Sequence, residues 1–500
     1  MNKKNVFTFV YPDFDYSINK KGEEKFNEGG WYSEGIAQLT AIIEDMGWEV
    51  NLLHINKPIS DKEFQRKLSA KNPDIIGFSI RTGVWKKAKD YVRLAGEMGK
   101  FLIAGSYHPS LWPEQVIQWE GINAICVGEG ENPIKELIKA YPDKKKLQKV
   151  GSCWVKDEKG NVIKNKVLPM ETDLDCLPIP KFEIFDFKKL FSSKIKTATV
   201  VLTRGCPYNC TYCWNNFARN LYPNKSCYIR CRSPKNCLEY ITKVKMVYPE
   251  LQSFRFQDDL WPFQNNWFDD FSELYIKNFK IKFECHLRAN LLTDKIVKRL
   301  KEMGCFGLYL GVESGNDYIR NKILKRYMTR EQITDAFDIC HKYSMRIHAY
   351  NIIGIPHEDM RMALDTIKLN ARIRPTDMFF FIFFPYAGTE LSNIGIEAGF
   401  FKEKDLLEGT IDIKMPKFPD NQIKFASYYG RMFTRLYQFN YKLPSFLKRS
   451  LDKILDWLWL FNHKPFRLLF WLFGIYRRAE ENLKLFIKRY FFQVYLWTKR

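Results

Sequence analysis

The first 140 residues alternate short apolar runs with amphipathic stretches, which is the pattern of strands separated by helices. Apolar runs of strand length fall at residues 5–11, 49–55, 74–79, 101–104 and 123–127. Helical periodicity lies between and after them, at residues 33–47, 61–71, 85–98 and 132–140. This alternation predicts a doubly wound, Rossmann-like parallel sheet, in which ligands bind at the carboxyl ends of the strands.

The alternation resumes at residue 197. Predicted strands fall at residues 199–203, 252–257, 281–285, 306–310, 346–353 and 378–384, and predicted helices at 234–247, 267–277, 293–303, 330–343 and 359–373. Six strand-helix units predict a partial (β/α)6 barrel of the TIM type, with functional residues on the loops that follow the strands.

The chain therefore divides into four predicted regions. Residues 1–145 form the Rossmann-like domain, 146–196 a hairpin at 151–167 followed by a linker, 197–400 the partial barrel, and 401–500 a helical C-terminal region that is basic and aromatic. The predicted fold class is α/β.

Three closely spaced cysteines follow the first barrel strand. Cys206, Cys210 and Cys213 have C-x3-C-x2-C spacing. Three thiolates hold three irons of a cubane [4Fe-4S] cluster and leave the fourth iron open to chelation by an amine and a carboxylate, the pair that the methionine end of S-adenosylmethionine offers. The alternatives are a zinc site completed by Cys227 or Cys231, and buried thiols that bind nothing.

With Tyr212 before the last cysteine and an apolar strand leading into it, this loop resembles the cluster loop of the radical S-adenosylmethionine superfamily. The resemblance implies that S-adenosylmethionine is bound by loops after the later strands. In these roles Asp258 or Asp259 lies near its amino group, Arg288 pairs with its carboxylate, Glu313 and Ser314 contact the ribose, and the Gly354-Ile355-Pro356 segment packs on adenine. The alternatives are a helix-capping aspartate, a surface ion pair for Arg288 and an ordinary turn after the fifth strand.

Glycine-containing loops follow three strands of the N-terminal region. In order, and together with residues 173–180, they resemble the cobalamin-binding domain that precedes the barrel in cobalamin-dependent radical S-adenosylmethionine enzymes, so the resemblance covers residues 1–400. The residues that it implies as cobalamin contacts are Ser79, Thr82, Gly105, Ser106, His108, Gly128, Glu129 and Gly130. A dinucleotide is disfavoured because no G-x-G-x-x-G follows the first strand.

The histidines bear on how cobalt is held. Many cobalamin proteins ligate it through the His of a D-x-H-x-x-G loop, but none of the 7 histidines here has an Asp two residues before it. We therefore expect cobalamin without a protein His as lower ligand, and a methyl-carrier role rather than mutase chemistry.

The charge and aromatic content of the chain are most informative about its C-terminal region. The net charge is +22, yet no nucleic-acid-binding motif accompanies it, so no nucleic acid is expected as a partner. From residue 443 onward there are 12 Lys or Arg against 4 Asp or Glu, together with 15 aromatic residues. Basic and aromatic residues in helical segments such as 454–461 and 466–476 suit the headgroup region of a membrane, and packing on the catalytic core is the equal alternative.

The cysteines and the N-terminus indicate the compartment. The 12 cysteines are scattered and no signal peptide opens the chain, so a disulfide framework is not expected and the predicted location is cytoplasmic, with peripheral membrane contact as the further hypothesis.

The resemblance implies a specific activity. The expected enzyme is a C-methyltransferase that cleaves S-adenosylmethionine to a 5'-deoxyadenosyl radical and acts on an unactivated carbon of a small-molecule or lipid-like substrate. Its electron donor would be a protein such as flavodoxin or ferredoxin. One alternative is a cobalamin-dependent radical enzyme with non-methylating chemistry, by cyclisation or rearrangement. The other is a non-catalytic cobalamin and iron-sulfur redox sensor.

Overall fold

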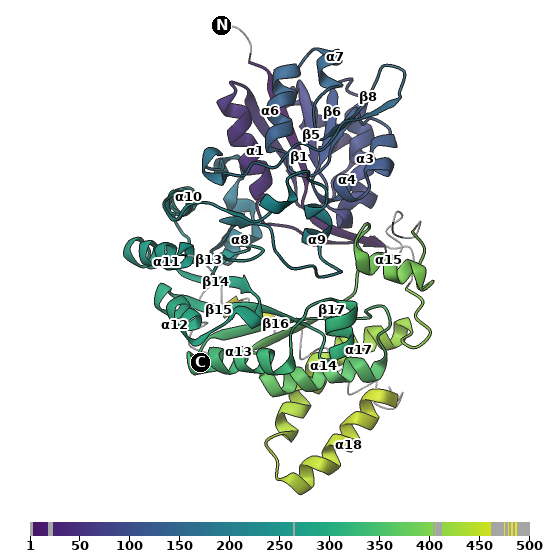
Figure 1. The fold of residues 1–500 in the computed structure, drawn as a ribbon. Helices are drawn as coiled ribbons and strands as arrows, with labels where there is room; N and C mark the ends of the chain where they lie inside the picture. Colours follow the sequence, from purple (N-terminus) through teal and green to yellow (C-terminus); the bar gives the residue numbers. More distant parts are fainter. Residues whose placement is uncertain are drawn as a thin grey trace.

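The computed structural model describes residues 4–461 except 19–23, 264–265, 404–405 and 407–412, and a few isolated positions beyond 461. Two mainly parallel sheets dominate the molecule, the N-terminal sheet at the top of Figure 1 and the second below it. The predicted α/β class, with a Rossmann-like domain followed by a partial barrel, is confirmed.

The first sheet has the strand order β4-β1-β5-β6-β7-β8-β9. Its strands are β1 (Val6–Pro12), β4 (Glu49–Ile55), β5 (Ile75–Ser79), β6 (Phe101–Gly105), β7 (Ala124–Cys126), β8 (Cys153–Lys156) and β9 (Val162–Lys164). The first five run parallel, and β8 and β9 add the predicted hairpin as an antiparallel edge. Every residue of β1 is buried, as expected for a central strand that helices cover on both faces.

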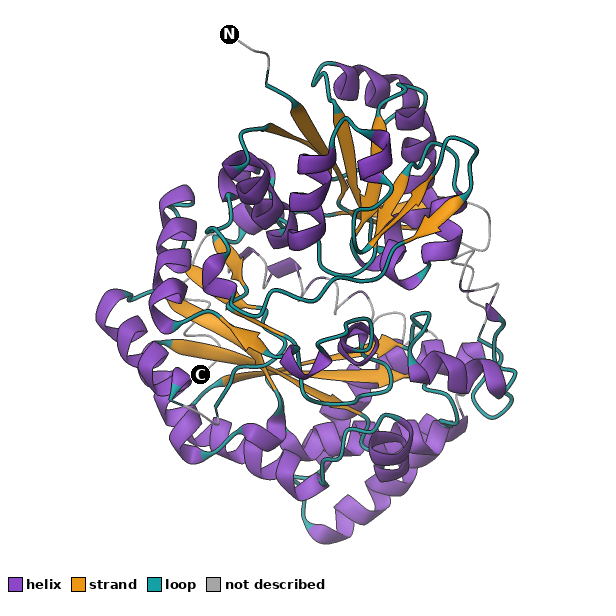
Figure 2. Ribbon diagram, turned by 45° about the horizontal axis from the view of Figure 1, so that its top comes forward, coloured by secondary structure: helices purple, strands orange, loops and turns teal. Residues whose placement is uncertain are grey.

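Helices pack on both faces of this sheet (Figure 2). One face carries α1 (Glu34–Asp45) and α6 (Glu131–Ala140), which contact each other, and the other carries α2 (Asp61–Ser69), α3 (Trp85–Gly96) and α5 (Pro113–Gln118). The sequence analysis missed the small antiparallel pair β2 (Phe14–Ile18) and β3 (Glu24–Glu28) between β1 and α1. The Lys and Glu residues of that segment mask any apolar alternation.

The second sheet is the six-stranded partial barrel, in the sequential order β10-β13-β14-β15-β16-β17. Its strands are β10 (Thr197–Val200), β13 (Ser253–Phe256), β14 (Lys282–Leu287), β15 (Cys305–Glu313), β16 (Arg346–Ile353) and β17 (Asp377–Ile382). The outer helices are α10 (Pro234–Val247), α11 (Trp267–Asn278), α12 (Asp294–Met303), α13 (Arg330–Lys342) and α14 (Met360–Ile373). The carboxyl ends of these strands therefore gather at one edge, where the site residues follow them.

After β17 the chain forms α15 (Glu390–Glu397), and the C-terminal region contains α17 (Asp420–Asn440) and α18 (Ser445–Phe461). Helix α17 packs on α14 and β17, and α18 returns along α17 as the second arm of a hairpin. In Figure 1 this hairpin projects at the end of the molecule away from the N-terminal sheet. The predicted helical segment at 466–476 lies almost entirely outside the described residues.

Candidate functional site

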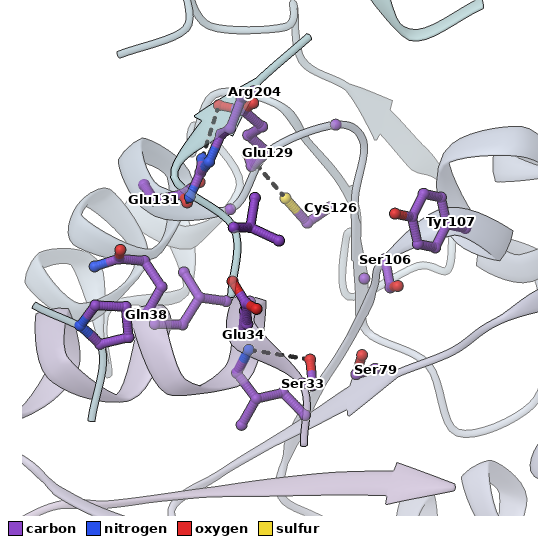
Figure 3. A pocket seen from close by; sticks show the side chains of 18 of the residues that line it. Ser33, Glu34, Gln38, Ser79, Ser106, Tyr107, Cys126, Glu129, Glu131 and Arg204 are labelled. Atoms are coloured by element: carbon purple, nitrogen blue, oxygen red, sulfur yellow. Dashed lines mark hydrogen bonds and ion pairs between the residues drawn. The ribbon is translucent and has the colours of Figure 1, made fainter. Parts of the chain in front are cut away.

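A cavity of about 520 Å³ lies where the carboxyl edges of the two sheets meet. The barrel side contributes residues that flank the three cysteines, with Arg204 and Gly205 before them and Trp214 after them. The N-terminal side contributes the end of β5 and the loops after β6 and β7, and the cavity continues between α1 and α6 over the apolar surface of β1 (Figure 3). One space thus has a polar mouth between the domains and an apolar slot inside the first domain.

Most of the residues predicted to contact cobalamin line this cavity. They are Ser79, Gly105, Ser106, Gly128, Glu129 and Gly130. The structure places Thr82 and His108 outside the lining. The His108 side chain is buried beside Trp85, with ring centroids 4.8 Å apart, and burial lowers its pKa to about 3. His108 therefore belongs to the apolar core beneath the loop.

The glycines at the cavity mouth allow other groups to approach the backbone closely. Gly128 has φ +89°, and a Cβ there would lie 2.6 Å from the Tyr222 hydroxyl oxygen. Tyr222 in turn accepts a hydrogen bond from the Glu129 backbone N–H at 2.7 Å. No histidine is among the described residues that line the cavity. Backbone-lined loops above an apolar slot suit a corrinoid whose nucleotide base enters the slot, so the residues fit cobalamin.

The paired carboxylates after β13, Asp258 and Asp259, hydrogen-bond to the segments on either side of the cysteines. Asp258 Oδ1 accepts hydrogen bonds from the backbone N–H groups of Leu202 and Thr203, at 2.7 and 2.6 Å. Asp259 accepts from Gly205 N–H at 3.0 Å and from the Asn215 side chain at 2.8 Å. Burial raises the pKa of Asp258 to about 6. Both carboxylates contact the segments that flank the cysteines, which is a positioning role.

Two arginines approach the thiol of Cys210. Arg288 Nη1 lies 3.6 Å and Arg326 Nη1 3.8 Å from its Sγ. Burial raises the pKa of Cys213 to about 12, so its thiol ionises readily only beside a cation or an iron. Within the described chain, no three His, Cys, Asp or Glu side chains converge as ligands of one metal ion. Thiolates of a cubane bind different irons and are spaced more widely than such ligands.

Sequence reasoning missed Arg326. Its guanidinium donates to the Tyr212 hydroxyl at 3.2 Å and to the Gly311 carbonyl at 2.5 Å, and Tyr212 donates to Glu313 Oε1 at 3.0 Å. Burial raises the pKa of Glu313, and the positive charge of Arg326 opposes that rise. The local sequence offers only the basic pair Lys325-Arg326 after Ile323 and Leu324, which does not indicate a contact with the cysteine loop.

The remaining residues predicted to bind S-adenosylmethionine separate into two groups. The backbone N–H groups of Gly354 and Ile355 donate to Glu358 Oε2 at 2.7 and 3.2 Å, and Ile355 belongs to the apolar cluster that Tyr212 packs against. Pro356 continues this buried turn. Ser314 is fully buried, and its hydroxyl lies 3.5 Å from that of Thr366 on α14, so it anchors the loop to the helix layer.

Ion pairs join the two loop-bearing edges. Arg204 lies two residues before Cys206 and pairs with Glu131 at 2.7 Å and with Glu129 at 3.4 Å. Arg230 pairs with Glu129 at 2.5 Å. The ring of Tyr107, after β6, meets that of Trp214 edge-on at 5.0 Å. The cysteine loop is thus held directly against the cobalamin-side loops.

Two family models match this chain. Residues 28–138 match the B12 binding domain and residues 200–369 match the Radical SAM superfamily. The chain is a cobalamin-binding radical S-adenosylmethionine enzyme. Its two domains imply a [4Fe-4S] cluster, S-adenosylmethionine and cobalamin as cofactors.

The relatives of this radical S-adenosylmethionine enzyme carry different activities in their names. An uncharacterized methyltransferase of Pyrococcus horikoshii is 26% identical over 363 residues, which are 71% of this chain and 77% of the relative. The anaerobic magnesium-protoporphyrin IX monomethyl ester cyclase of Rubrivivax gelatinosus is 21% identical, and the match covers 68% of this chain and 62% of the cyclase.

Solved structures share the fold. The radical S-adenosylmethionine methyltransferase TsrM of Kitasatospora setae, solved with tryptophan and a co-substrate analogue, has a TM-score of 0.63 at 13% identity, over 80% of this chain and 77% of TsrM. The cobalamin-dependent radical enzyme OxsB with aqua-cobalamin has a TM-score of 0.65 at 18% identity, over 91% of this chain and 72% of OxsB. None of the helices in the described part of this chain has the length and apolar character to cross a bilayer.

Proposed function

We propose that this enzyme is a C-methyltransferase that acts on an unactivated carbon. The observation that carries the proposal is the cavity between the domains, because one space is lined both by the cobalamin-side loops and by residues that flank the three cysteines. A methyl source and a radical source can then face the same substrate carbon. The relative named as a methyltransferase, matched over 77% of its length, agrees with this activity.

When bound, the cluster would pass an electron from an external donor to S-adenosylmethionine, giving methionine and a 5'-deoxyadenosyl radical, and cobalamin would carry the methyl group. The thiolates of Cys206, Cys210 and Cys213 would hold the cluster. Arg288 and Arg326, which contact Cys210 Sγ, offset the negative charge of the thiolates.

Other residues orient S-adenosylmethionine and stabilise the loops. Glu313, already bonded to Tyr212, is an acceptor for ribose hydroxyl groups. The turn at Gly354 and Ile355 presents a buried apolar surface for adenine. Asp258 and Asp259 keep the cysteine loop in place through its backbone. The net charge of +22 complements an acidic one-electron donor such as flavodoxin or ferredoxin.

The test uses the full chain, reconstituted anaerobically with iron, sulfide and cobalamin, and S-adenosylmethionine with a deuterated methyl group. With a chemical reductant and a small-molecule cell extract, we expect a deuterated product together with 5'-deoxyadenosine and S-adenosylhomocysteine. Cys210→Ala should abolish 5'-deoxyadenosine, whereas the exposed Cys227→Ala should leave it unchanged.

The outcomes separate the competing activities. An extract component that raises 5'-deoxyadenosine but never acquires deuterium would contradict methyl transfer and support cyclisation or rearrangement; the Rubrivivax gelatinosus relative is named as a cyclase. A reduced, cluster-loaded enzyme that forms no 5'-deoxyadenosine would contradict catalysis and support the redox sensor.

A further inference from the structure

The α17–α18 hairpin carries an exposed apolar stripe that the proposed catalysis does not use. On α18 the stripe consists of Phe446, Ile454, Trp457 and Phe461, with exposed fractions of 69%, 53%, 46% and 60%. Their spacing, together with Ser450 between the first two, follows steps of three and four residues, so they share one face of the helix. Large side chains on one helix face at this exposure mark an interaction surface.

The opposite face of α18 packs against the rest of the protein. Leu455 and Trp459 are buried, and the Trp459 indole donates to the Met360 carbonyl at 2.9 Å. Helix α18 is therefore fixed on α14 and α17, and the stripe is held outward by a folded support. This arrangement differs from that of a loose helix, because the apolar face does not have to be ordered upon binding.

The charges of α18 are sorted by sign. Its two acidic residues are engaged on the protein side: Asp452 accepts from Asn440 at 2.7 Å, and Asp456 pairs with Lys368 at 2.6 Å. Arg449 and Lys453 are exposed, and in the described part of the chain no ion pair involves either of them. The outward side of the helix thus combines aromatic and aliphatic side chains with uncompensated positive charge.

We propose that this face of α18, formed by Phe446, Arg449, Lys453, Ile454, Trp457 and Phe461, docks the enzyme on an anionic phospholipid surface. Aromatic and apolar side chains enter the boundary between headgroups and acyl chains, and the basic side chains contact lipid phosphates. No such surface is needed for cofactor binding at the cavity, because the hairpin lies at the opposite end of the molecule from the N-terminal sheet (Figure 1). The enzyme would then meet a lipid-like substrate at a membrane.

Flotation of the full-length, cofactor-loaded enzyme with vesicles tests the proposal. We expect binding to vesicles of phosphatidylcholine and phosphatidylglycerol, weaker binding to phosphatidylcholine alone, and a fall in binding as salt is raised. Arg449→Gln with Lys453→Gln should weaken binding to anionic vesicles about thirtyfold, since each basic residue near such a surface contributes about 1 kcal/mol. Phe446→Ala with Ile454→Ala should weaken it by about tenfold or more.

Matched variants on a different helix serve as controls. Lys277→Gln with Lys280→Gln removes two exposed charges, one in the last turn of α11 and one two residues beyond its end, and Met246→Ala removes an apolar side chain that is 72% exposed on α10. Both should bind vesicles as the unaltered chain does. Thermal unfolding of every variant without vesicles should match that of the unaltered chain, because all the altered side chains are exposed.

Two results would overturn the proposal. One is an unaltered enzyme that stays with the soluble fraction beside anionic vesicles, whatever else its α18 face contacts. The other is full binding by both α18 double variants, which would assign membrane contact to another segment. Flotation reports position and not turnover, so its outcome and that of the deuterium-transfer experiment are independent.

Discussion

The edges of the two sheets that meet at the cavity differ in what they offer to a ligand: one offers mainly backbone, the other mainly charged side chains. The cobalamin side presents backbone: Gly105, Gly128 and Gly130 lie at its mouth. The cysteine side presents long side chains that hydrogen-bond to one another. Arg326 donates to Tyr212 and lies near Cys210. A large neutral ligand needs space close to the backbone, whereas an anionic cluster needs compensating charge. Adding a methyl group should therefore damage the first edge, and removing a charge the second.

The strongest test of this comparison is Arg326→Ala. It removes the main compensating cation of the buried Glu313 and leaves Arg288 as the remaining arginine at the thiol of Cys210, so we expect the free energy of unfolding to fall by about 3 kcal/mol. The iron content after reconstitution should fall with it, and 5'-deoxyadenosine formation should drop on the order of a hundredfold. Denaturant titration, iron analysis and nucleoside analysis measure the three effects.

Arg361→Ala is the matched control for Arg326→Ala, because Arg361 is exposed on the outer helix α14. It should leave stability and turnover within experimental error. Unchanged iron content in the Arg326 variant would show that charge at this edge is not what prepares it for the cluster.

At the cobalamin edge, Gly128→Ala should weaken ligand binding through the volume of the added methyl group. Both Gly128 and the distant Gly47 have left-handed φ values, +89° and +86°, so alanine at either position costs about 1–2 kcal/mol of backbone strain. A Cβ at position 47 meets no atom within 4 Å, whereas one at position 128 meets the Tyr222 hydroxyl at 2.6 Å. We expect Gly128→Ala, and not Gly47→Ala, to weaken cobalamin binding about tenfold, on the scale of an overpacked contact.

Equilibrium dialysis against cobalamin compares the two glycine variants directly, and denaturant titration shows whether their strain is equal. Equal loss of cobalamin affinity in both would mean that backbone strain, and not space at the cavity mouth, explains the effect. The claim that the cobalamin edge depends on space close to the backbone would then be wrong.

The same contrast explains what the sequence could predict. Glycines after buried strands are local signals, and Gly105, Gly128 and Gly130 were all found from them. Arg326 reaches Cys210 across 116 residues, and nothing near it in the chain indicates that contact. Strand positions followed from periodicity, so the α/β class of both domains could be predicted, but the order of the strands in each sheet was not predicted. The direction in which a loop hydroxyl points could not be predicted from the sequence. Ser314, for example, turns toward Thr366.

Glu358 refines the comparison, because this barrel-side carboxylate accepts hydrogen bonds from backbone N–H groups and is not paired with an arginine or lysine in the described part of the chain. It accepts from Gly354 and Ile355, and burial raises its pKa from 4.5 to about 8. Between these two values the folded state binds more proton than the unfolded state, so this group's contribution to stability is full below about pH 4.5 and is lost as the pH rises toward 8. The loss is about 1.4 kcal/mol per pH unit at most.

Glu358→Gln keeps an oxygen acceptor and removes the titration. We expect the free energy of unfolding of the unaltered enzyme to fall relative to that of the variant as the pH is raised from 5 to 8, in denaturant titrations at constant ionic strength. Glu397→Gln, at an exposed position on α15, should run parallel to the unaltered enzyme. Parallel curves for Glu358→Gln as well would mean that the buried carboxylate is ionised across this range. The cysteine side would then carry a negative charge that its arginines do not neutralise.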